Sequence, residues 1–288
     1  MTEKLNMVSK SRVFTEQKAD RTKQAGHHLR TWGKIVKFIG PPVVLLTIML
    51  VLWQALVDIL EVNPMILPTP DRIVMAGIKD RISIRKAVGI SLRETLSGLA
   101  VGLVSALVIA VLIDAFDILR RSIYPLLVSA QTIPVVAIAP LLVIWFGFGL
   151  FPKVLLVAIY TSFPMIVSLT GGMDATPKHS VDIMRTLGYG KWKIILTVKL
   201  PSALPQFFSG VRVAASYALG TAIIGEFLGA ANGIGVYMTA AKSSFRTDLV
   251  FAASFVTVLL TLILYGSVIV IEKLALPWVS KGGEKENE

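Results

Sequence analysis

Six long apolar segments, separated by polar segments rich in lysine and arginine, constrain this 288-residue chain more than any other feature. A helix needs about 20 apolar residues to cross about 30 Å of hydrocarbon, and most of the segments reach that length. Only 16% of the residues are charged, against about a quarter in soluble domains. The sequence therefore predicts an all-α polytopic membrane protein with six transmembrane helices, at about residues 42–60, 92–113, 134–150, 153–173, 206–229 and 250–272. The span at 134–150 is short and contains prolines, and residues 122–133 are a possible extension of it.

The distribution of basic residues predicts how the chain is oriented. With both termini inside, the inner segments carry 19 of the 29 Lys and Arg residues and the outer segments carry eight. Cytoplasmic loops of membrane proteins carry such an excess, so both termini are expected in the cytoplasm of a bacterial cell membrane. The net charge of +11 then reflects orientation and not a nucleic-acid surface. The expected organisation is a basic tail at 1–40, a transmembrane domain at 41–275 with a cytoplasmic loop at 174–205, and a second tail at 276–288.

Several kinds of chemistry are excluded by composition. The chain has no cysteine and three histidines, too few and too scattered for a convincing metal site. A phosphate-binding loop requires Gly, four residues, then Gly-Lys-Ser/Thr. Gly190-Lys191 is a candidate for the Gly-Lys of such a loop, but Arg185 and Trp192 occupy the positions of the first Gly and of the Ser/Thr. We therefore expect no enzyme activity and no cofactor, and any energy from ATP must come from a partner subunit.

The cytoplasmic loop before the fifth apolar segment reads as two short helices joined by glycines. Thr176 is a candidate N-cap, and Gly188 suits a left-handed helix end. A second helix is expected over 191–200, with Pro201 and Pro205 breaking the chain before the next span. Two interpretations remain open on composition alone. The loop is either a knob that docks into a groove on a partner protein or an amphipathic loop that rests on anionic headgroups.

The spacing within this loop resembles the EAA loop of permeases in ATP-binding-cassette importers. That pattern is Glu-Ala-Ala, three residues, Gly, nine residues, Ile, one residue and Leu-Pro. The corresponding residues are Asp182-Ile183-Met184, Gly188, Val198 and Leu200-Pro201, so the two alanines are replaced. Four other stretches resemble the nitrate/sulfonate/taurine branch of these permeases: ILPTPDRI, TIPVVAIAPLLVIWFGFG, GEFLGAANGIGVYM and FRTDLVFA. Together the likeness covers about residues 45–275.

The resemblance implies a type I importer permease architecture, with a path enclosed by two copies of the chain. It implies as partners a cytoplasmic ATPase dimer and an extracytoplasmic binding protein that delivers the solute. The solute would be a sulfonate, taurine, nitrate or a thiamine-type pyrimidine precursor. The residues expected to couple to the ATPase are Asp182, Arg185, Thr186, Leu187, Gly188, Tyr189, Leu200 and Pro201. The alternative is a secondary transporter or channel that works without an ATPase, although such proteins usually show intramembrane carboxylates or inverted repeats.

Polar residues beside prolines within the spans are candidates for the translocation path. Such prolines are either tolerated kinks or bends that line the path. Glu226, near the outer end of the fifth span, is either an interfacial acid held by Lys242 or Arg246, or a gate residue. Arg93 and Glu94 are expected to be interfacial anchors. The candidate path residues are Gln131, Thr132, Pro134, Thr161, Ser162 and Glu226.

Overall fold

A computed structural model describes residues 40–278 of the chain. The predicted basic tail at 1–40 and the predicted C-terminal tail lie almost wholly outside the described residues. The chain divides after Asn63 into two compact units. The first unit contains one apolar helix, Gly40–Ile59.

The second unit contains helices only among its described residues. A five-residue π-helical turn, Ile195–Lys199, joins two of them without a break. The helices are α2 (Pro70–Lys79), α3 (Arg81–Ala115), α4 (Asp117–Ala130), α5 (Val135–Phe146), α6 (Leu150–Asp174), α7 (Lys178–Thr186), α8 (Lys191–Ile194), α9 (Leu200–Phe227), α10 (Ile234–Ser243) and α11 (Thr247–Ala275).

Small residues let α3, α6 and α9 pack closely in the centre of this unit. A Cβ atom added at Gly98 of α3 would lie 2.5 Å from the Cβ of Val157, and one added at Gly210 of α9 would lie 2.7 Å from the carbonyl oxygen of Pro164. Such contacts are typical of helix pairs in membranes, where small side chains allow backbones to approach. The core of larger side chains between these helices is formed by residues such as Ile113, Met165, Ile166, Leu169 and Phe207.

The described residues contain five helices long and apolar enough to cross a membrane, or six if α4 and α5 form one bent span. The predicted span at 134–150 is therefore corrected: α4 and α5 meet at an angle of 105°. Pro134 sits at the N-cap of α5, and α5 ends before Gly147, whose φ is +76°. The predicted span at 92–113 is also longer than expected. Its helix begins at Arg81 and includes the basic residues Arg85 and Lys86 before the predicted apolar segment.

The prediction that Pro201 and Pro205 break the chain is wrong. Residues 191–227 run as one continuous helical segment. The π-helical turn widens the helix directly before Pro201, which stands at the first or second position of α9. Because proline lacks the N–H that an α-helical ladder needs, this wider turn accommodates it without ending the helix.

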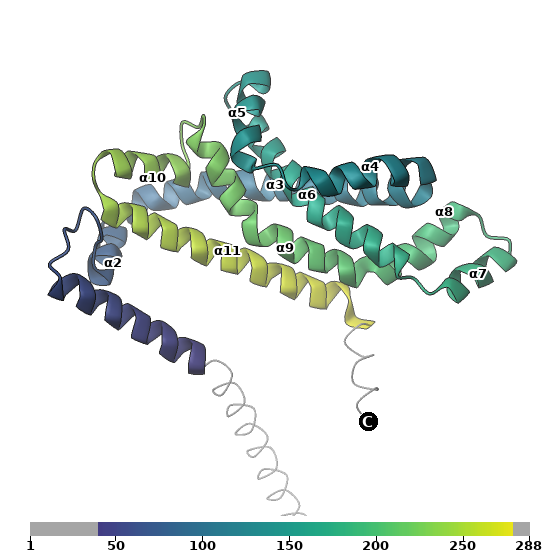
Figure 1. Cartoon of the computed structure of the whole chain (residues 1–288), viewed down its shortest axis with the longest axis horizontal. Coiled ribbons are helices and arrows are strands. Elements are labelled where there is room, and N and C mark those ends of the chain that lie inside the picture. The colour runs from purple at the N-terminus through teal and green to yellow at the C-terminus, as the bar shows by residue number, and fades with distance from the viewer. Residues whose placement is uncertain (1–39, 279–288) are drawn as a thin grey trace, which may run out of the picture. The chain divides into compact units, whose positions relative to one another are not determined.

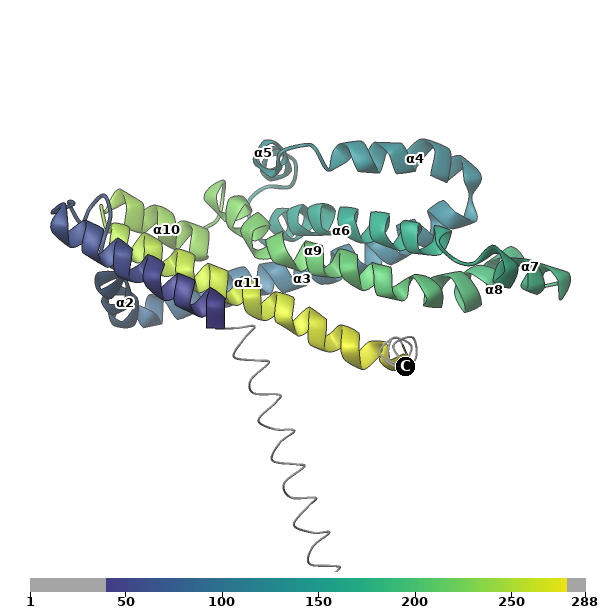
Figure 2. The ribbon, with the colours of Figure 1, turned by 60° about the horizontal axis from the view of Figure 1, so that its bottom comes forward.

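The two ends of the second unit carry different elements. In Figures 1 and 2, α7 and α8 lie together at one end, while α2 and α10 lie at the opposite end. The EAA-type loop and the loops predicted to be extracytoplasmic thus fall at opposite ends of the helical bundle.

Candidate functional site

A helix, a glycine turn and a second helix form the loop between α6 and α9. At the end of α7, Gly188 has a φ of +80°. Its N–H donates to the carbonyl oxygen of Arg185 at 2.9 Å, and the N–H of Tyr189 donates to that of Met184 at 3.0 Å. These two bonds make a Schellman motif, in which a glycine in the left-handed region ends the helix. The predicted left-handed conformation of Gly188 is confirmed.

The tip of this hairpin is exposed and mixes charged with apolar side chains. Asp182 and Arg185 face each other with 3.6 Å between their nearest charged atoms, and both side chains are about two-thirds exposed, at 67% and 69%. Leu187 is 66% exposed. Most of the predicted coupling residues gather on this tip: Asp182, Arg185, Thr186, Leu187, Gly188 and Tyr189 are all exposed. Leu200 and Pro201 lie apart from it, at the start of α9.

The predicted N-cap of α7 is wrong by one residue. Pro177 occupies the cap position with φ −55° and ψ 126°, so α7 begins at Lys178. The extended backbone of Pro177 moves the first helical turn away from Thr176. The Thr176 hydroxyl is buried and has no hydrogen-bond partner among the described residues.

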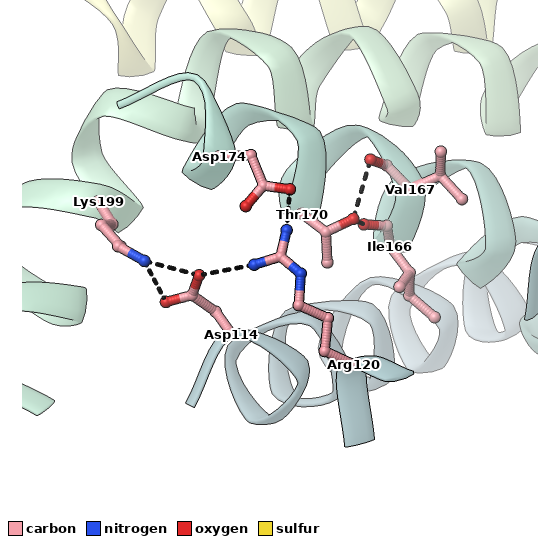
Figure 3. Close-up of polar contacts among 7 residues, drawn as sticks. All are labelled: Asp114, Arg120, Ile166, Val167, Thr170, Asp174 and Lys199. Carbon is pink, nitrogen blue, oxygen red and sulfur yellow. Dashed lines mark hydrogen bonds and ion pairs between the residues drawn. The ribbon is translucent and has the colours of Figure 1, made fainter. Parts of the chain in front are cut away.

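A network of four charged side chains connects the base of the hairpin to helices α3, α4 and α6 (Figure 3). Lys199, in the π-helical turn, donates to both carboxylate oxygens of Asp114 at the end of α3, at 2.8 and 2.9 Å. Arg120, in the second turn of α4, donates to Asp174 at the end of α6. Arg120 also lies 4.0 Å from Asp114. Two positive and two negative side chains alternate in this network, so the net charge of the network is zero.

The candidate path residues fall in two different environments. Gln131, Thr132 and Pro134 are exposed at the break between α4 and α5. The hydroxyl of Tyr160 on α6 donates to the carbonyl oxygen of Ile133 at 2.9 Å and holds this break against α6.

Thr161 and Ser162, in contrast, are buried inside the unit. The Thr161 hydroxyl donates to the carbonyl oxygen of Val157 in its own helix, at the place where Gly102 of α3 packs closest. The Ser162 hydroxyl donates to the carbonyl oxygen of Ile159, also in α6. Thr161 and Ser162 therefore differ from Gln131, Thr132 and Pro134 in burial, and their hydroxyls are bonded within α6.

The expected pairing of Glu226 with Lys242 or Arg246 is wrong. Glu226 is 1% exposed. Its carboxylate accepts hydrogen bonds from the hydroxyl of Ser91 on α3 and from the N–H of Gly235 in the first turn of α10. The first N–H groups of a helix have no partner within it and attract a carboxylate. Arg246 binds Asp248 instead, at 2.9 Å and only two residues away.

Glu94 is not an interfacial anchor, because it is 2% exposed. It forms an ion pair with Lys153 of α6, which is also buried. Of the two residues expected at the interface, Arg93 is the exposed one. The charge of Glu94 is thus tolerated in the bundle by pairing and not by contact with water.

A further polar contact fixes the start of α3. Asp80 accepts hydrogen bonds from the hydroxyls of Ser83 and Tyr237, each at 2.6 Å. These two bonds lower the pKa of Asp80 below its usual value. Burial, followed by the bond to Asp80, raises the pKa of Tyr237. The contact therefore joins α10 to the start of α3 with an ionised carboxylate.

Sequence reasoning missed the partners in these networks. Ser91 and Gly235 hold Glu226, and Asp114 holds Lys199, across 135, 9 and 85 residues of sequence respectively. The available signals were weak: a serine in a long helix, a glycine two residues after another, and one acid at the end of an apolar run. None of them names its partner.

The family of the chain follows from comparison with known proteins. Residues 96–279 match the family described as "Binding-protein-dependent transport system inner membrane component". The chain is 32% identical over 244 residues to the formylaminopyrimidine transport permease protein ThiX of Halalkalibacterium halodurans, covering 83% of this chain and 96% of ThiX. It is 22% identical over 240 residues to the taurine transport system permease protein TauC of Escherichia coli, covering 81% and 87%.

A solved structure shares the fold. The chain aligns with the inward-facing MetNI methionine ABC transporter with a TM-score of 0.60 at 17% identity, covering 68% of this chain and 97% of the matched chain. At this identity the match supports the fold alone. The family match covers more than half of the chain, and the predicted resemblance to importer permeases is confirmed. The chain belongs to the binding-protein-dependent transport system inner-membrane components, and it is a multi-pass permease subunit of an ATP-binding-cassette importer.

Proposed function

We propose that this permease forms the path for a small solute that an extracytoplasmic binding protein delivers, and that a cytoplasmic ATPase dimer drives transport by gripping the hairpin tip. The observation that carries the proposal is the tip itself. Its exposed residues are held at a fixed angle by the Schellman motif at Gly188, in a chain of this family. The tip residues proposed to contact the ATPase are Asp182, Arg185, Thr186, Leu187, Gly188 and Tyr189.

A second copy of the chain completes the path in this proposal, giving a homodimer. The exposed polar residues at the break between α4 and α5, Gln131 and Thr132, are proposed to face the solute, with Pro134 fixing the bend. Thr161, Ser162 and Glu226 are left out of the proposed path because their side chains are buried and bonded within the unit.

The orientation proposed has both termini and the hairpin in the cytoplasm. The Lys/Arg asymmetry supports it. The hairpin and the outer-loop elements α2 and α10 lie at opposite ends of the second unit (Figures 1 and 2), as this orientation requires.

The solute we favour resembles the pyrimidine precursor of thiamine, ahead of a sulfonate, taurine or nitrate. The support is that the formylaminopyrimidine permease is 32% identical over 244 residues, against 22% over 240 residues for the taurine permease. The riboflavin transport system permease protein RibX of Chloroflexus aurantiacus is also 32% identical, over 247 residues, so riboflavin is the competing solute. The test is a thermal-shift screen of the cognate binding protein against formylaminopyrimidine, riboflavin, taurine, an alkanesulfonate and nitrate. Stabilisation by formylaminopyrimidine alone is expected, whereas stabilisation by riboflavin, taurine or a sulfonate alone would contradict this choice of solute.

The ATPase interaction is tested by affinity capture in mild detergent. The tagged permease is expected to retain the cognate ATPase subunit, and transport in proteoliposomes should require both ATP and that subunit. Failure of the wild-type permease to retain the ATPase under conditions that keep it folded would refute the proposed role of the hairpin.

A further inference from the structure

The position of helix α4 depends on a few contacts. The helix buries none of its side chains fully. Tyr124 and Leu127 are half-buried against the core between α3, α6 and α9. At one end the Tyr160 hydroxyl holds Ile133, just beyond the helix, and at the other end Arg120 makes the ion pairs shown in Figure 3. Both views place α4 at the edge of the second unit.

Arg120 ties α4 to both roots of the hairpin. Asp174 is the last residue of α6, where the hairpin leaves the bundle, and Lys199 lies where the hairpin returns to it. Arg120 binds Asp174 directly, and it lies 4.0 Å from Asp114, whose carboxylate binds Lys199 at 2.8 Å. A displacement of either root therefore changes the ion-pair geometry of Arg120.

The two halves of this network differ in burial. The side chain of Asp114 is 2% exposed, and Lys199 satisfies both of its oxygens. The Asp114–Lys199 pair should stay intact when the hairpin moves, since a buried charge that loses its partner is strongly disfavoured. The side chains of Arg120 and Asp174 are 42% and 45% exposed. Exposed pairs contribute little to stability, so a substitution in this half should change how α4 is connected to α6 without unfolding the protein.

We propose that Arg120 is a positioning residue for transport: through Asp174 and Asp114 it transmits movement of the ATPase-binding hairpin to helix α4, and thereby to the break between α4 and α5. Residues 117–130 form one helix with Pro125 inside it, and its C-cap residue Gln131 lies about 16 Å along the axis from Arg120, at 1.5 Å per residue. The inference rests on the proposed function, because it assumes that the ATPase moves the hairpin.

The experiment uses the assembled complex of permease and ATPase. The natural chain has no cysteine, so Gln131→Cys gives a single reporter at the break between α4 and α5. Its rate of labelling by a water-soluble maleimide is read on the separated permease band. Rates are compared for the nucleotide-free complex and for the complex trapped with ATP and vanadate.

Nucleotide trapping is expected to change the labelling rate of Gln131→Cys in the permease that carries no other substitution. Arg120→Gln should reduce this change by up to about fivefold, the factor that corresponds to one exposed ion pair. Arg120→Lys should restore part of it, because it keeps the charge. Binding and ATP hydrolysis by the ATPase subunit should remain in both variants.

Arg121→Gln is the matched control. Arg121 is the next residue of α4, is exposed and makes no ion pair with any of the residues that the structure describes. It should keep the full response. Asp174→Asn removes the same ion pair from the side of α6, and it replaces Arg120→Gln if that variant does not assemble.

A full response in Arg120→Gln or Asp174→Asn, an equal loss in Arg121→Gln, or no response in the permease that carries Gln131→Cys alone would overturn the inference. A wild-type permease that does not bind the ATPase at all would instead refute the proposed function, and this inference with it.

Discussion

Replacing Gly188 by valine should separate the permease from its ATPase while leaving the transmembrane core intact. Gly188 has a φ of +80°, and a Cβ added there would meet no atom within 4 Å. The cost of the substitution is therefore backbone strain and not a clash. An L-residue in the left-handed region costs about 1–2 kcal/mol, and a β-branched side chain adds to this.

The turn can escape this strain only by opening. Opening breaks the two bonds of the Schellman motif, from the N–H groups of Gly188 and Tyr189, each worth about 0.5–1.5 kcal/mol net. The loss is thus about 1–3 kcal/mol by either route, which weakens docking of the tip by about 5- to 150-fold. The helices that form the core contain no part of this turn, so insertion into the membrane should be unchanged.

The assay is capture of the ATPase subunit by tagged permease in mild detergent, with solute transport measured in parallel. Gly188→Asn should retain more binding than Gly188→Val, because asparagine tolerates the left-handed region better. The matched control is Gly190→Ala. Gly190 also has open space around a Cβ, but its φ is −71°, which any residue adopts. Full ATPase binding and full transport in Gly188→Val would refute the reasoning and favour a loop that rests on lipid headgroups.

Three further outcomes follow from other parts of the structure. Lys191→Cys should be labelled only from the cytoplasm and Asp71→Cys only from outside in intact cells, and labelling of Lys191→Cys from outside would reverse the proposed topology. Lys153→Met should lower the free energy of unfolding of the permease by about 3–5 kcal/mol, since it leaves Glu94 buried without its ion-pair partner. In thermal unfolding, adding Glu94→Leu should recover part of that loss. Gly233→Ala should lower the melting temperature by about 2–4 °C per kcal/mol lost, because its Cβ would overlap the Glu226 carboxylate at a φ of +132°, whereas Gly220→Ala, with open space around it, should not lower it.

Local features of the fold were predictable from sequence. The left-handed glycine at 188 and the apolar segments follow from preferences that act within a few residues. Three predictions failed where a neighbouring residue or a packed helix determined the local structure. The Thr176 cap moved because Pro177 took the extended position. The break at Pro201 was absorbed by a π-helical turn, and Glu226 found its partners on α3 and α10.

The polar networks of the candidate site were beyond sequence reasoning for a different reason. Asp114 and Lys199 are 85 residues apart, and Arg120 and Asp174 are 54 apart. Each is an ordinary charged residue near the end of a helix when read alone. Only the packing of α3, α4 and α6 against the hairpin brings them together, and no periodicity encodes which acid meets which base.

The most direct test of the account is solute uptake into proteoliposomes that contain the permease and its ATPase, with the loaded binding protein on the side opposite the ATPase. The account predicts uptake only with hydrolysable ATP and none from the permease alone, even under an imposed proton or sodium gradient. Gradient-driven uptake by the permease without the ATPase would show instead a secondary transporter and contradict the central claim.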